Sequence, residues 1–168
     1  QQFPDAHIVY IKGNHEDRME KYLWTQAPER WKLKGMNLAE QVELVRLNIR
    51  WVDNIKLKRE SRTFYKFGRL SLLHGHELGI CPRENPARRY LLKARASLVV
   101  GHIHKPDEAY QNTINNDSIA CHCVGTLSNM YPDYMAQNDW VAGFAVVELD
   151  ADGYYRVDNR KIIDGRIV

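Results

Sequence analysis

Short apolar runs that end in a glycine beside histidines constrain the fold of this sequence more than any other feature. The pattern occurs in the stretches IVYIKGNHE, LSLLHGHE and LVVGHIH. These stretches contain most of the histidines of the chain, namely His15, His74, His76, His102 and His104. A short, continuously apolar run is typical of an interior strand. Because α/β proteins collect catalytic and binding groups where strands end, the pattern predicts buried strands that present functional histidines.

Each stretch alone also has an ordinary interpretation, in which a histidine at a strand end makes structural hydrogen bonds. In extended backbone, however, His102 and His104 would point the same way and could serve adjacent metals. The neighbouring glycines let the backbone approach a ligand closely. Three such strand ends in one small chain are difficult to ascribe to packing. We therefore favour a metal site over three sets of structural histidines.

The order of the expected elements indicates an α/β fold. Apolar residues recur every three or four positions from Leu38 to Val52, which predicts a helix that ends near Asn54, with Asn37 and Glu40 as a capping box. Asn85 and Pro86 predict the start of another helix, and a helix is also expected from about residue 16. Strands are expected at 7–11, 63–67, 70–75, 97–101, 118–125, 140–150 and 154–162. This order favours one layered domain over 1–168, with 36–54 as a candidate helical cap segment.

Composition and cysteine content restrict the class of protein. The chain has 168 residues, 44% hydrophobic and 27% charged, with a net charge of +3 that permits an anionic substrate. No apolar run approaches the roughly 18 residues of a membrane helix, so we expect no membrane partner, and the odd, sparse set of cysteines favours a reducing cytoplasm. Cys121 and Cys123 flank His122, which suggests either metal ligands or a strand with both thiols in the core. The spacing of two residues places both thiols on one face of a strand, which favours the core. A structural zinc site would need a second Cys/His pair, and the sequence has none at a suitable spacing.

The ordered set GNHE, HGH and GHIH resembles the calcineurin-like metallophosphoesterase family. The family pattern is D-x-H, G-D-x-x-D, G-N-H-[DE], a lone His usually followed by Gly, and G-H-x-H, and its last three blocks are present in order. The resemblance extends from about His7 to the end of the chain, and the tail is similar to small bacterial and phage-type members. It implies a layered α/β/β/α sandwich, of which this chain is the C-terminal portion.

The resemblance also implies a role for each matching residue. In this family two divalent metals lie side by side. Asn14, His74 and His102 would ligate the second metal, and His104 the first. His15 would be the catalytic histidine that protonates the leaving oxygen, with Glu16 orienting or polarising it. Contacts to substrate are expected, as weaker assignments, from Arg18, His76 and Arg83.

The implied activity is hydrolysis of a phosphomonoester or phosphodiester by a hydroxide bound between the two metals. Paired metals neutralise the phosphate and lower the pKa of the attacking water, and a histidine near neutral pH can supply the proton that the leaving group needs. Imidazole together with amide and carboxylate oxygen suits Mn, Fe, Zn or Ni better than Mg or Ca. The sequence does not choose among these metals or name the substrate.

The D-x-H and G-D-x-x-D blocks of the family pattern are missing from the sequence. We expect the chain to be a fragment of a longer phosphoesterase; a half-domain completed by another chain and a degenerate relative are the alternatives. The isolated chain is expected to hold at most one metal well and to have weak or no activity. Missing strands would expose a sheet edge, which favours a homodimer.

The alternative function is a catalytically inactive binding module for protein or nucleic acid. Basic runs at 56–62 and 83–89 are either a solvated surface or a rim that attracts anions such as nucleic acid. Tyr131, Tyr134 and Trp140 either line a pocket or, as we expect, pack in the core.

Overall fold

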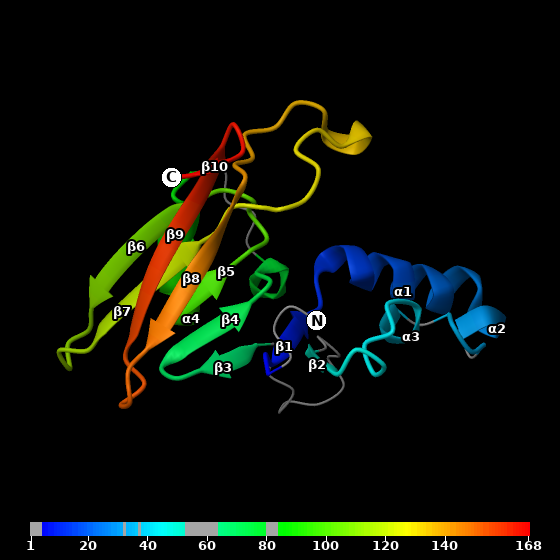
Figure 1. Ribbon diagram of the computed structural model, residues 1–168, viewed down its shortest axis with the longest axis horizontal. Helices are drawn as coiled ribbons and strands as arrows, with labels where there is room; N and C mark the ends of the chain where they lie inside the picture. The colour runs from blue at the N-terminus through cyan, green and yellow to red at the C-terminus, as the bar shows by residue number, and fades with distance from the viewer. Residues whose placement is uncertain (1–4, 32, 37, 53–63, 80–83) are drawn as a thin grey trace. The chain divides into compact units, whose positions relative to one another are not determined.

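The helices and strands of the chain divide into two units, 1–63 and 64–168. The computed structural model describes residues 5–31, 33–36, 38–52, 64–79 and 84–168. These residues form a mixed α/β fold with sheets of two, three and five strands and few helices (Figure 1). None of the helices in these ranges is both long and apolar enough to cross a membrane. The mixed α/β class predicted from the sequence is therefore confirmed.

The described residues of the first unit form a parallel strand pair and three helices. Strand β1 (Ile8–Ile11) pairs with β2 (Ile49–Val52), and the rings of Tyr10 and Trp51 stack across the pair with their centroids 5.2 Å apart. Parallel strands need a long crossover connection, and helices form it here. These helices are α1 (Asn14–Gln26), α2 (Pro28–Trp31) and α3 (Leu38–Gln41).

The helix predicted from Leu38 to Asn54 is wrong. Helix α3 ends at Gln41, and Glu43 and Asn48 both adopt positive φ, which ends any right-handed helical path. Residues Ile49–Val52 form β2 instead, because β-branched and aromatic side chains suit a strand that pairs with β1. Residues 36–54 are therefore not one helical cap, although 37, 53 and 54 lie outside the described residues. Of the predicted capping box, Asn37 lies outside the described residues, and Glu40 accepts a hydrogen bond from the Gly35 amide.

The second unit is built on a five-stranded sheet whose order is β3-β4-β5-β7-β6. The three inner strands are mutually parallel, and the two outer strands run antiparallel to their neighbours. All but β6 were predicted, because their apolar runs are bounded by glycine or polar residues. The strands are β3 (Tyr65–Phe67), β4 (Leu70–Leu73), β5 (Leu98–Val100), β6 (Asp107–Asn112) and β7 (Ser118–Cys123).

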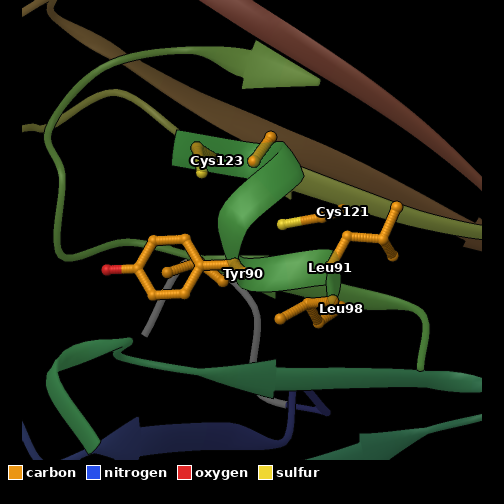
Figure 2. Packing of buried hydrophobic residues seen from close by; sticks show 7 residues of the cluster. Tyr90, Leu91, Leu98, Cys121 and Cys123 are labelled. Atoms are coloured by element: carbon orange, nitrogen blue, oxygen red, sulfur yellow. The ribbon is translucent and has the colours of Figure 1, made fainter. Parts of the chain in front are cut away.

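Helix α4 (Pro86–Ala94) covers one face of this sheet and forms the core with it. Figure 2 shows the buried side chains of Tyr90 and Leu91 meeting those of Leu98, Cys121 and Cys123. Both thiols are fully buried, so the core interpretation of the Cys-x-Cys pair is confirmed. The contact with Cys123, followed by burial, raises the pKa of the Cys121 thiol, which keeps this thiol protonated and unreactive.

The start of α4 confirms one sequence signal and corrects another. Pro86 occupies the first turn, as predicted, because its missing N–H has no partner to lose there. The predicted cap residue Asn85 has a left-handed backbone, and its side chain makes no capping hydrogen bond. Instead, the Ala87 amide donates to Asp107 Oδ2 over 2.9 Å. The cap therefore comes from β6, which sequence reasoning had not placed beside the helix.

A three-stranded antiparallel sheet completes the second unit. It comprises β8 (Gly143–Leu149), β9 (Tyr155–Ile163) and β10 (Arg166–Ile167), and the predicted turn at 150–153 joins the first two. The two sheets contact each other in the middle of β9 and at the turn between β8 and β9. Asn159 Nδ2 donates to the Cys123 carbonyl over 2.8 Å, and Arg69 N donates to the Gly153 carbonyl over 3.0 Å. Figure 1 shows β8 and β9 crossing the larger sheet.

Adjacent leucines of α4 provide a test of this core. Leu91 is 2% exposed and Leu92 is 50% exposed. Leu91→Ala should lower the free energy of unfolding of the second unit by about 2–5 kcal/mol, because it leaves a cavity beneath the helix. Leu92→Ala should change it by less than about 1 kcal/mol. Denaturant titration followed by circular dichroism measures both, and equal losses would contradict the packing described.

Candidate metal centre

His74 and His102 lie together because β4 and β5 are parallel neighbours in register. Leu73 is opposite Val100, so the chain leaves both strands at the same edge of the sheet. The His74 carbonyl then accepts two backbone hydrogen bonds, from Gly101 N at 3.1 Å and from His102 N at 2.8 Å. The strand pairing thus continues to the histidines themselves and fixes their backbones against each other.

The two imidazoles face each other with a ring nitrogen from each at the contact. His74 Nε2 and His102 Nδ1 are 3.1 Å apart, and the ring centroids are 4.9 Å apart. Two nitrogens bound tetrahedrally to one metal at 2.0–2.1 Å would be about 3.3 Å apart. The observed spacing is therefore close to that of a pair of ligands on one ion, and the donor type suits a divalent transition metal.

His76 joins this pair from a short 3₁₀ helix, η1 (His76–Leu78). Its ring centroid is 5.1 Å from that of His74 and 6.1 Å from that of His102. The chain turns sharply at Gly75, where φ is 120°, and Glu77 Oε2 accepts the Gly75 amide at 2.6 Å. The sequence placed His76 in the site only as a weaker substrate contact, and the structure brings it into the same ring cluster.

His104 has a different environment from the extended one expected. Its φ is 59°, and its amide donates to the Gly101 carbonyl at 3.1 Å, which closes a turn over Gly101–His104. The prediction that His102 and His104 point the same way in extended backbone is therefore wrong. The His104 ring packs edge-on against Trp140, with centroids 4.3 Å apart. Trp140, which the sequence offered either as a pocket residue or, as we expected, as a core residue, is half-buried beside this histidine.

The GNHE residues lie at the start of α1 in the first unit. Asn14 and His15 occupy its first turn, where His15 is exposed and Asn14 is half-buried. Glu16 closes the turn, because its carboxylate accepts the Gly13 amide at 2.9 Å and the Tyr10 hydroxyl at 2.8 Å. Burial, together with this bond to Glu16, raises the pKa of Tyr10 to about 12. The predicted role of Glu16 in orienting His15 stays a prediction.

Lys12 is a residue that sequence reasoning missed. Its side chain is 2% exposed and pairs with Asp17 Oδ1 at 2.9 Å and with Glu20, both on α1. A buried ammonium is costly unless it is paired, so these bonds tie the end of β1 to the first two turns of α1. The signal was a charged residue inside an otherwise apolar run, with acidic residues three positions apart on the following helix.

The remaining predicted contacts are dispersed or outside the described residues. Arg18 is exposed on α1, whereas Arg83 lies outside the described residues, as does the basic run at 56–62. Within the part of the chain that the structure describes, no group of three or more His, Cys, Asp or Glu side chains is arranged to hold a metal ion. Comparison with known proteins gives no match to a family model, a curated protein or a solved structure.

Two glycines that flank η1 test how tightly this cluster is built. A Cβ at Gly75 would lie 2.4 Å from Val100 Cγ1 and 3.1 Å from the Cβ of His102, whereas a Cβ at Gly79 meets nothing within 4 Å. Both glycines have positive φ, so both substitutions carry backbone strain, which is about 1–2 kcal/mol for the left-handed Gly79 and of order 1–3 kcal/mol for Gly75 at a φ of 120°.

Only Gly75→Ala adds a clash, so it should lower the free energy of unfolding by at least about 1 kcal/mol more than Gly79→Ala. It should also shift the imidazole NMR resonances of His102. Denaturant titration and proton–nitrogen spectra measure the two effects. Equal destabilisation with unshifted His102 resonances would show that Gly75 is not in close contact with β5.

Proposed function

We propose that this chain is part of a metal-dependent phosphoester hydrolase of the calcineurin-like type, acting on a phosphomonoester or phosphodiester. One observation carries the proposal, namely the facing ring nitrogens of His74 and His102 at the ends of adjacent parallel strands. The two imidazoles are half-buried, and their ring nitrogens are within hydrogen-bonding distance of each other. Their arrangement suits two ligands that approach one cation from neighbouring strands.

The donor set fits a divalent transition metal such as Mn, Fe, Zn or Ni. His74 and His102 would hold it with ring nitrogens. When bound, paired divalent metals neutralise the charge of a phosphate group and acidify water. Ligation by Asn14 and by His104 is part of the proposal as well, and it rests on the sequence motifs rather than on distances in the structure.

The chain's own residues would bind the phosphoester and move a proton. His15 is exposed in the first turn of α1, where the helix dipole favours an anion, and its ring could donate a proton to the leaving oxygen. Glu16 and Lys12 hold that turn against β1. Arg18, one turn along the same helix and exposed, is a candidate for charge contact with the phosphate.

The proposal includes the fold that the resemblance implies, a layered α/β/β/α sandwich. Its support is the packing of α4 on the five-stranded sheet and the contacts between that sheet and the β8–β9 hairpin. Pairing of two copies through an exposed sheet edge is also proposed.

A binding module without catalysis is the second candidate. The observation in its favour is that the described residues contain no group of three side chains arranged around a metal position. A protein of this kind would keep the histidine cluster as a hydrogen-bonded structural feature. The two candidates differ in whether the cluster binds metal.

Metal binding by matched histidine variants separates the two candidates. The wild-type chain, dialysed against Mn²⁺ or Zn²⁺ and then against buffer, should retain about one ion per chain, because the imidazole pair holds it. His74→Ala and His102→Ala should each lower the affinity at least about tenfold, since even second-shell losses cost that much. His7→Ala removes an exposed histidine outside the three motifs and serves as the control. Elemental analysis and titration calorimetry measure content and affinity.

Retention of metal by all three variants would show that the ion binds elsewhere and would overturn the assignment. Absence of binding in the wild-type chain at millimolar metal would favour the binding module. Circular dichroism of each variant checks that the fold is intact.

A further inference from the structure

The loop between β7 and β8 carries aromatic side chains to which the proposed function assigns no role. The sequence analysis expected Tyr131 and Tyr134 to pack in the core, and that expectation is wrong. Tyr131 is 76% exposed and Tyr134 is 65% exposed. Figure 1 shows the loop, with its short helix η2 (Asp133–Met135), extending away from the sheets. Exposed rings grouped on one loop are a feature that packing does not explain.

A series of ring contacts leads from His104 to this loop. The His104 ring meets Trp140 edge-on at 4.3 Å, and the Trp140 ring lies 6.5 Å from that of Tyr134. The loop begins and ends beside His104, because Val141 N donates to the His104 carbonyl at 2.9 Å and Thr126 N donates to the Val141 carbonyl at 2.9 Å. The exposed tyrosine is therefore two ring contacts from a proposed metal ligand.

Internal hydrogen bonds hold the loop in shape and keep its tyrosines presented to solvent. Asn138 Nδ2 donates to the carbonyls of Met130 and Met135 at 2.8 and 2.9 Å, and Asn138 Oδ1 accepts the Trp140 amide at 3.0 Å. A loop packed by its own polar side chains is typical of a functional loop rather than of a passive connection. These bonds hold the backbone of the loop in shape before any ligand binds, which lowers the entropy lost on binding.

From these observations we propose that the 126–141 loop binds the base of a nucleotide whose phosphate lies at the histidine cluster. A planar base has a π-face that stacks on tyrosine or tryptophan, and this needs no specific hydrogen bonds. The loop starts and ends beside His104, which follows His102 of the cluster by two residues. This inference names the substrate class of the proposed hydrolase and rests on that proposal.

The charge of the loop favours a single nucleotide over a nucleic acid strand. Residues 126–141 include Asp133 and Asp139 and have no lysine or arginine. A strand of nucleic acid that followed the loop would bring further phosphates against these carboxylates, and single-strand binding surfaces are normally basic. Asp139 is also paired with Lys105, which leaves that lysine less able to attract a polyanion. The loop therefore suits a base and not a chain of phosphates.

Comparison of adenosine 5′-monophosphate with ribose 5-phosphate tests the inference, because the two probes share the phosphate and differ in the base. In titration calorimetry the wild-type chain should bind the nucleotide at least about fivefold more tightly than the sugar phosphate, as expected for one stacked base. Tyr134→Ala should abolish that preference, and Tyr134→Phe should retain it. Tyr154→Ala, a change at a tyrosine 55% exposed in the β8–β9 turn, should leave it unchanged.

Equal binding of the two probes by the wild-type chain would overturn the inference, and so would equal effects of the Ala changes at Tyr134 and Tyr154. Self-association that depends on Tyr134, without a preference for the nucleotide, would also overturn it and would mark the loop as a contact between copies. If His74→Ala leaves metal binding unchanged while the wild-type chain still prefers the nucleotide, the inference is upheld and the proposed hydrolase function is refuted. If metal binding depends on His74 but the chain shows no preference for the nucleotide, the hydrolase proposal is upheld and the inference is overturned.

Discussion

The parallel register of β4 and β5 is the constraint on which the candidate centre depends. Leu73 opposite Val100 places the two strand ends at one edge, and the His74 carbonyl receives the amides of both Gly101 and His102. The strands keep this register because their side chains are buried under α4 with Leu98 and Cys121. A shift of one residue would turn the apolar faces outward and separate the imidazoles. The core and the histidine pair are thus consequences of the same pairing.

The first unit positions its residues by electrostatics rather than by a large core. Lys12 at the end of β1 pairs with Asp17 and Glu20 on α1, while Glu16 accepts the Gly13 amide. Charged hydrogen bonds of this kind are stronger than neutral ones and fix direction as well as distance. The first turn of α1, with Asn14 and His15, is therefore held in one orientation relative to its own strand. Both units place their motif residues just beyond a strand end.

The sequence was informative where structure depends on local patterns and misleading where it depends on distant partners. Apolar runs predicted β4, β5 and β7, and the alternation of Cys121 and Cys123 predicted their burial. The helix at 38–54 failed because β2 is stabilised by β1, far away in the sequence, and such pairing leaves no local signal. The predicted extended backbone of His104 and the predicted burial of Tyr134 were wrong for the same reason. A turn sets the backbone of His104, and a loop held by its own hydrogen bonds exposes Tyr134.

The central proposal is that the facing ring nitrogens of His74 and His102 hold one divalent metal ion. Paramagnetic broadening by bound Mn²⁺ tests it most directly, because the effect falls steeply with distance and is read for each histidine separately in an NMR spectrum. We predict that one bound ion broadens the imidazole resonances of His74 and His102 together and spares that of the exposed His7. Sharp His74 and His102 resonances in the presence of bound Mn²⁺ would contradict it.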